Sequence, residues 1–296
     1  IQRFYMSKLK RAISENGGII IYALDSTDIV REMERIHKTS AVASAALGRL
    51  LTAACMMSMT LKHEDDLLTV RINGGGKLGT ILATASGSGT VKGYVQNANA
   101  DMPSRVDGKL DVGGAVGHEG TLSVIKDLGL KEPYVGQVPI VTGEIAEDIT
   151  AYYAASEQTP TVCALGVLVD KDLSIISAGG YLVQLLPGAS DEEIDALEHN
   201  VASAPSVTQM LSSGKSTMDI INIILQGFNP NVLDEMKVEY HCDCSVTRVE
   251  AALLSLGKDE LDDMLETQPN VEITCQFCDK VYNINVEKLI KSNKNL

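Results

Sequence analysis

The residues Cys242-Asp-Cys244 and Cys275-Gln-Phe-Cys278 decide how the last part of this chain folds. They form a C-x-C pair and a C-x-x-C pair that are separated by thirty residues, and they hold four of the six cysteines within 37 residues. Structural zinc sites use four ligands in a tetrahedron, and two short pairs of thiolates supply such a set. The pattern therefore predicts that these four cysteines bind one zinc ion.

Other interpretations of the four cysteines stay open at this point. Soft sulfur ligands also suit Cu(I) or iron–sulfur chemistry, and the four thiols could be unrelated. His241 precedes the first pair and could replace a ligand, although four cysteines already fill the shell. Spacing alone favours a purely structural zinc site over a redox sensor in which oxidation removes the ligands and releases the metal.

The segment 238–296 that surrounds the cysteines is predicted to be a small zinc-binding domain. Val271–Thr274 and Val281–Ile284 are the expected strands of a hairpin around the second pair. Thr247 and Glu250 resemble a capping box at the start of a helix. A unit of about sixty residues buries little apolar surface, so we expect loss of the metal to unfold it.

The preceding segment, 188–237, is predicted to be a helical linker. Ser190 and Glu193 form a capping box, and Pro and Gly residues break the segment into short helices. The segment carries two basic and eight acidic residues. Its apolar stripe, Ile220–Leu225, has to be covered when the linker is docked, and its release would expose a surface able to bind partners.

The first 187 residues are predicted to form an α+β domain with a largely antiparallel sheet and helices on one face. Its expected strands lie at 18–24, 67–72, 77–85, 90–96, 121–125, 135–141, 162–169 and 175–186. Its expected helices lie at about 26–36, 41–61 and 144–156. The chain is thus expected to be an N-terminal mixed sheet-and-helix domain, a helical linker and a small C-terminal domain.

Composition and charge restrict the possible functions. The 296 residues carry a net charge of −14, which argues against nucleic acid as a partner. Arg49 interrupts the longest apolar stretch, Ala41–Leu61, so a buried helix is expected there rather than a membrane span. No secretory signal is visible, and we expect a cytoplasmic protein without a membrane partner, where paired cysteines indicate metal or redox chemistry.

The sequence resembles the heat-shock protein 33 family of redox-regulated chaperones along nearly its whole length. The segments that carry the resemblance are 43–49 (ASAALGR), 121–129 (TLSVIKDLG), 143–148 (GEIAED), 156–160 (SEQTP) and 178–187 (AGGYLVQLLP). The most specific match is the C-x-C and C-x-x-C pattern in a C-terminal domain that follows a helical linker.

The resemblance implies a chaperone that is not an enzyme and that holds one zinc ion per chain when reduced. It implies that oxidation pairs Cys242 with Cys244 and Cys275 with Cys278, releases zinc and unfolds the linker. The activated form would then bind unfolding client proteins without ATP, often as a homodimer. Cys55 and Cys163 lie in apolar runs outside the motif, and we expect them to be buried, inert thiols.

Two alternative functions remain from the residues themselves. A thiol–disulfide oxidoreductase could use Cys275 and Cys278, but such a motif normally opens a helix rather than a hairpin. A zinc-dependent nucleic-acid binding protein is the other alternative. Residues 238–296 carry six basic and eleven acidic side chains, which opposes it.

Overall fold

The computed structural model of the chain describes residues 7–293, which divide into two compact units. The first unit ends at His241, and the second begins at Cys242. Within the first unit the predicted α+β architecture is confirmed. The boundary lies four residues after position 238, where the sequence placed it, because the backbone as far as Tyr240 is still part of a strand.

A ten-stranded sheet with the order β7-β6-β3-β4-β5-β10-β1-β2-β9-β8 forms the frame of the first unit. Neighbouring strands are antiparallel, except that β10 and β5 run parallel over a short stretch. The strands are β1 (Ser7–Ile13), β2 (Ile19–Asp25), β3 (Leu67–Asn73), β4 (Ile81–Ser86), β5 (Thr90–Val95), β6 (Thr121–Asp127), β7 (Tyr134–Pro139), β8 (Thr161–Val169), β9 (Ile175–Leu185) and β10 (Asn231–Tyr240).

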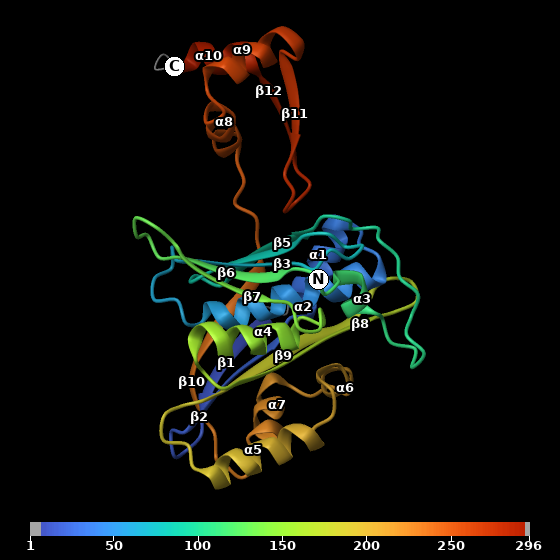
Figure 1. Cartoon of the computed structure of the whole chain (residues 1–296), viewed down its shortest axis with the longest axis vertical. Coiled ribbons are helices and arrows are strands. Elements are labelled where there is room, and N and C mark those ends of the chain that lie inside the picture. Colours follow the sequence, from blue (N-terminus) through green and yellow to red (C-terminus); the bar gives the residue numbers. More distant parts are fainter. Residues whose placement is uncertain (1–6, 294–296) are drawn as a thin grey trace, which may run out of the picture. The chain divides into compact units, whose positions relative to one another are not determined.

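The helices of the first unit fall into two groups. One group packs between the two halves of the sheet, and the other packs on the outer side of the half that contains β1, β2, β9 and β8 (Figure 1). The first group includes α1 (Thr27–His37), α2 (Ala41–Ser58), α3 (Val112–Val116), α4 (Ala146–Tyr152) and the π-helical turn η1 (Tyr153–Glu157). The second group consists of α5 (Asp191–Ser203), α6 (Val207–Ser212) and α7 (Thr217–Ile224).

Strand β2 explains why helices lie on both sides of this half of the sheet. Alternate residues of a strand point to opposite faces, so a strand that is apolar at every position needs cover on both. Ile20, Tyr22 and Leu24 are buried against α1 and α2, whereas Ile19, Ile21 and Ala23 are buried against α5–α7. The helices within residues 1–187 therefore pack on one face, as expected, and the other face is covered by the helices of the predicted linker.

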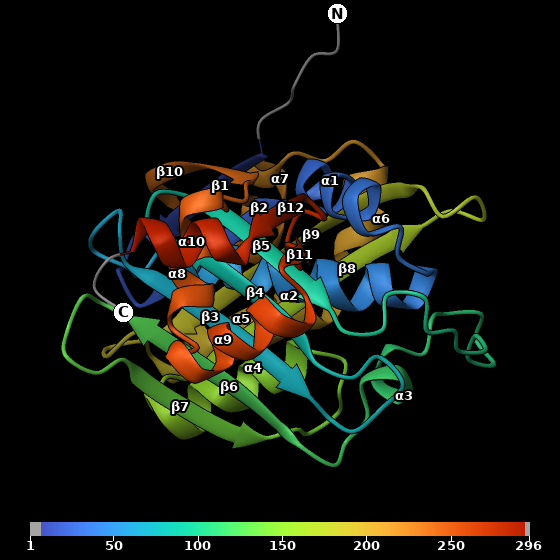
Figure 2. The same cartoon turned by 90° about the horizontal axis from the view of Figure 1, so that it is seen from above.

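Helix α2 is the central helix of the first core. It contacts β3, β4 and β5 above it and β8 and β9 below it, and Figure 2 shows it running beneath β4 and β5. By length and composition α2 could cross a membrane, but 89% of the helix is buried inside the protein. Its apolar character is thus the character of a core helix, as the sequence predicted.

Strands β1 and β10 are two elements that the sequence did not reveal in full. Both carry many charged residues, and β10 lies mostly inside the segment predicted to be a helical linker. Their charges pair across the two strands: Lys10 and Lys8 with Glu235, and Arg11 with Asp234. Long-range ion pairs of this kind leave no local pattern in the sequence, because the partners are more than 220 residues apart.

The second unit is small and has its own hairpin. It contains α8 (Val246–Leu254), α9 (Lys258–Thr267), β11 (Asn270–Thr274), β12 (Val281–Asn285) and α10 (Val286–Ser292), with β11 and β12 paired antiparallel. The predicted hairpin is confirmed. The predicted capping box of Thr247 and Glu250 is wrong, because α8 begins at Val246 and the Ser245 hydroxyl accepts the Arg248 N–H at 3.3 Å.

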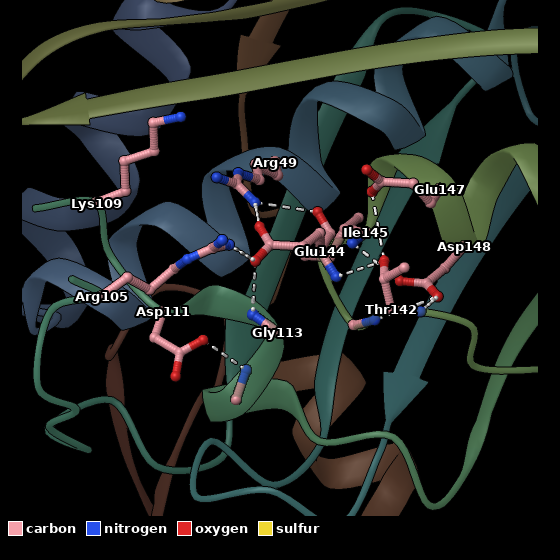
Figure 3. Close-up of polar contacts among 12 residues, drawn as sticks. Arg49, Arg105, Lys109, Asp111, Gly113, Thr142, Glu144, Ile145, Glu147 and Asp148 are labelled. Carbon is pink, nitrogen blue, oxygen red and sulfur yellow. Dashed lines mark hydrogen bonds and ion pairs between the residues drawn. The ribbon is translucent and has the colours of Figure 1, made fainter. Parts of the chain in front are cut away.

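An ion-pair cluster braces α2 against the loop before α4 (Figure 3). Arg49 Nη1 donates to Glu144 Oε2 at 2.6 Å and to the Glu144 carbonyl oxygen at 3.1 Å. The other carboxylate oxygen accepts the Gly113 N–H at 3.2 Å and lies 3.6 Å from Arg105 Nη1. Glu144 therefore joins three segments, and the arginine in the apolar helix has its charge compensated.

The loop that carries Glu144 is held by a buried carboxylate, that of Asp148. Its oxygens accept the backbone N–H groups of Val141, Thr142 and Ile145 at 2.8–3.0 Å, as Figure 3 shows in part. Ile145 has a φ of 75°, which is unfavourable for a β-branched residue. The hydrogen bonds to Asp148 compensate for this backbone conformation and fix the direction in which Glu144 points.

The Glu144→Gln variant should lower the free energy of unfolding of the first unit by about 1–3 kcal/mol, because Arg49 then loses the charge that compensates its burial. Urea unfolding followed by circular dichroism measures the change. Glu119→Gln is the matched control, since Glu119 is exposed. Equal stability of the two variants would show that the cluster does not brace α2.

Candidate metal centre

The four cysteines of the motif come from two places in the second unit. Cys242 and Cys244 lie in the segment that follows β10, and Cys275 and Cys278 lie in the turn between β11 and β12. The structure thus puts the C-x-x-C pair in a hairpin turn and not at the start of a helix. This position is typical of metal-binding loops and differs from the position of a thioredoxin-like motif.

Backbone hydrogen bonds shape the turn that presents the second pair. The Cys275 N–H donates to the Lys280 carbonyl oxygen at 2.9 Å, and the Asp279 N–H donates to the Cys275 carbonyl oxygen at 2.9 Å. Asp279 takes a left-handed conformation with a φ of 57°, which Asp tolerates better than most residues. The turn closes the hairpin and brings Cys275 and Cys278 to a common side.

The four sulfur atoms gather in one cluster. All four Sγ atoms lie within 4.8 Å of one another, and the nearest contacts are 3.3 Å between Cys244 and Cys278 and 3.7 Å between Cys242 and Cys275. Four thiolates at the usual Zn–S distance of about 2.3 Å form a tetrahedron with edges of about 3.8 Å. The cluster therefore has the donor type, the number of donors and the spacing that a soft metal ion requires.

The cluster consists of the four cysteines that the sequence motif predicts. His241 is not part of it, and its backbone N–H donates to the Val91 carbonyl oxygen beside β10. Arg248 forms an ion pair with Asp243, the residue between Cys242 and Cys244. The positive charge of Arg248 is thus held next to the first pair of sulfurs.

Tyr282 is a residue of the site that the sequence did not reveal. Its hydroxyl lies 3.0 Å from Cys244 Sγ. Burial disfavours the thiolate of Cys244, but hydrogen bonds from Tyr282 and the other cysteines outweigh it and lower the pKa of Cys244 to about 7. The same hydrogen bond raises the pKa of Tyr282 to about 12, so Tyr282 stays a proton donor to the sulfur.

The two remaining cysteines lie outside the cluster, in the first unit. Cys55 is buried in α2, and burial raises the pKa of its thiol to about 12. Burial also raises the pKa of the thiol of Cys163, which is a half-buried residue of β8. A protonated thiol is a poor nucleophile, so the chemistry of both residues agrees with the prediction of inert cysteines.

The core of the second unit is small. Its buried apolar residues are Leu253, Leu261, Val271, Ile284, Val286 and Leu289. Units of this size often depend on a metal or disulfides for stability, since apolar burial alone barely offsets the loss of conformational entropy. A metal ion bound by the four cysteines would therefore supply a large part of the folding free energy of this unit.

A large α+β unit and a small unit with four clustered thiols define a two-part protein whose C-terminal cysteines could hold a metal ion. The sequence model of the family described as "Hsp33 protein" matches residues 7–285. The chain is 49% identical to the 33 kDa chaperonin of Clostridioides difficile over 97% of this chain and 98% of that protein, and 47% identical to that of Clostridium acetobutylicum over the same shares. The crystal structure of the 33 kDa chaperonin of Thermotoga maritima superposes with a TM-score of 0.89, at 33% identity and with 97% and 98% of the chains covered. The chain belongs to the Hsp33 family, and this membership supports a chaperone role.

The Cys275→Ser variant should bind Zn²⁺ more than about tenfold more weakly, because even loss of an outer-shell partner of a metal ligand typically costs that much. Competition with a chromophoric chelator measures the affinity. Cys163→Ser is the control, since Cys163 lies outside the cluster, and it should keep the full affinity. Unchanged affinity in Cys275→Ser would exclude Cys275 as a ligand.

Proposed function

We propose that the protein is a redox-regulated, ATP-independent holdase that protects unfolding proteins from aggregation under oxidative stress. In this proposal the reduced form holds one Zn²⁺ on Cys242, Cys244, Cys275 and Cys278 and is inactive. The observation that carries the proposal is the cluster of four sulfur atoms in a unit whose apolar core is too small to depend on packing alone.

Oxidation is the event that we propose removes the ligands. Hydrogen peroxide and two protons take two electrons from a pair of thiolates, which gives one disulfide and two water molecules. We assign the disulfides to Cys242–Cys244 and Cys275–Cys278, following the resemblance to the family. A disulfide sulfur is no longer an anionic ligand, so the metal is released and the second unit loses its main stabilising contribution.

The proposed output is the undocking of residues 188–237, which we infer to be the metastable linker. Its helix α7 buries Ile220, Ile221 and Ile224 against the outer face of β1 and β2. Strand β10 joins α7 to Cys242 along the chain, and its pairing with β5 is short, at Glu239–Thr90 and Tyr240–Val91. Because β10 also pairs with β1 along Ser7–Ile13, we propose that loss of order at the cysteines reaches the linker by loosening β10 from both neighbouring strands.

Undocking would expose two apolar surfaces at once. One is the inner side of α5–α7, and the other is the face of the sheet that contains Ile19, Ile21 and Val183. Exposed apolar surfaces of this kind bind unfolded polypeptides without a nucleotide. We propose that the clients are partly unfolded proteins, that the activated form is a homodimer, and that the protein works in the cytoplasm and not as an enzyme.

The decisive experiment treats the reduced, zinc-loaded protein with hydrogen peroxide at raised temperature. Zinc release, followed with a chromophoric chelator, should coincide with suppression of the aggregation of an unfolding test protein. Cys163→Ser should respond in the same way, since Cys163 lies outside the cluster. Complete zinc release with undiminished aggregation of the test protein would contradict the proposal.

A substitution that weakens the docking of the linker should activate the protein without an oxidant. Ile221 has no exposed surface, and Ile221→Asn would bury an amide without a partner in the interface between α7 and the sheet. We expect this variant to suppress aggregation while it is reduced and still holds its zinc. The control is a substitution of the next residue, Asn222→Asp. Because Asn222 is exposed, this variant should stay inactive while it is reduced. Hydrogen exchange of the α7 amides measures undocking. If Ile221→Asn undocks α7 and the variant still does not suppress aggregation, undocking is not what activates the protein.

A further inference from the structure

A cavity lies between helix α5 and the outer side of strands β8 and β9. Its volume is about 450 Å³, within the range of small-molecule sites. The sheet contributes Val162 and Val183 to its wall, and α5 contributes Ile194, Leu197 and Val201. The cavity is thus bounded by the body of the first unit on one side and by the first linker helix on the other.

The charged residue among those that line this cavity is acidic. Glu198 lines the cavity and is exposed. Helix α5 begins with Asp191, Glu192 and Glu193, and its thirteen residues include no Lys or Arg. A ligand with an aliphatic body would find apolar walls, and a positive head group would find Glu198 at the edge. An anionic head group would be repelled there.

Helix α5 is also the part of the linker that is least firmly packed. Of its thirteen residues only Leu197 is fully buried, whereas the eight residues of α7 include Thr217, Ile220, Ile221 and Ile224 as buried residues. The cavity therefore occupies the place where apolar contacts between linker and sheet are missing. A ligand there would add contacts to both sides at once.

We propose that this cavity binds a small aliphatic cation and that such a ligand stabilises the docked linker. The site exists only while α5 lies on the sheet, because the walls come from both. A ligand that binds one of two states shifts the equilibrium toward that state by mass action. The ligand thus opposes release of the linker. Its effect on activation rests on the proposed function, but its binding and its effect on α5 do not.

The test uses the full-length, reduced, zinc-loaded protein. The three probes, octylammonium, 1-octanol and octanoate, have the same alkyl chain length and differ in the head group. Titration calorimetry and the methyl NMR signals of Val162 and Val183 should show saturable binding of octylammonium at these residues. Octylammonium should bind more tightly than octanoate by about two- to fivefold, the range expected for one exposed ion pair. Hydrogen exchange of the amides of Asp191–Ser203 should slow when octylammonium is bound.

Two pairs of variants distinguish binding in the cavity from binding elsewhere on helix α5. Ala202 and Ala196 are both exposed residues of α5, but only Ala202 lines the cavity. Ala202→Phe should weaken octylammonium binding at least about fivefold by filling the space, and Ala196→Phe should leave it unchanged. Glu198→Gln should remove the preference for the cation, whereas Asp195→Asn should keep it, since Asp195 is exposed and does not line the cavity.

The proposal fails if the binding of octylammonium does not saturate or if octanoate binds equally well. It also fails if Ala202→Phe binds octylammonium as tightly as the wild type does. A further failure would be that bound octylammonium leaves the hydrogen exchange of the α5 amides unchanged. In the activation assay, bound octylammonium should delay the onset of holdase activity after peroxide, and faster onset would overturn the regulatory effect. Absence of holdase activity without any ligand would instead contradict the proposed function and leave the binding result standing.

Discussion

The constraint on which the first unit depends is that strand β2 has no polar face. Its residues from Ile19 to Leu24 are all buried, so both sides of the sheet must be covered. Helices α1 and α2 cover one side, and their core also includes the inner side of β3, β4, β5 and β6. Within residues 7–293, the helices that cover the other side are α5–α7. The molecule therefore contains an apolar surface whose exposure depends on whether α5–α7 stay docked.

The two units differ in what stabilises them. The first unit has an extended core of aliphatic residues around α2, whereas the second has a handful of buried residues and a cluster of sulfur atoms. A packed aliphatic core does not respond to oxidants, but thiolates do. Strand β10 belongs to the first unit and runs directly into the first cysteine pair. This connection is the route by which, in the proposed function, a chemical event in the small unit affects the cover of the sheet in the large one.

Much of the fold and the candidate site could be predicted from local patterns. The apolar runs gave the positions of β2, β8, β9 and α2, the Ser190–Glu193 pair began α5 where expected, and the cysteine spacing identified the four clustered thiols. Other features could not be predicted, for different reasons. Strands β1 and β10 are held by ion pairs between distant segments, and the capping residue of α8 depends on a backbone geometry that Thr247 does not adopt. Tyr282 reaches Cys244 only because the hairpin brings β12 to the first cysteine pair.

The sequence by itself determined the type of chemistry, since two closely spaced cysteine pairs suit a soft metal ion whatever their surroundings. It also determined most helices and strands, because the periodicity of apolar residues is a local property. Only the tertiary structure decided which face of the sheet the linker covers, how β10 connects the linker to the cysteines, and where a cavity remains under α5. These features depend on contacts between residues far apart in the chain, which a local pattern does not record.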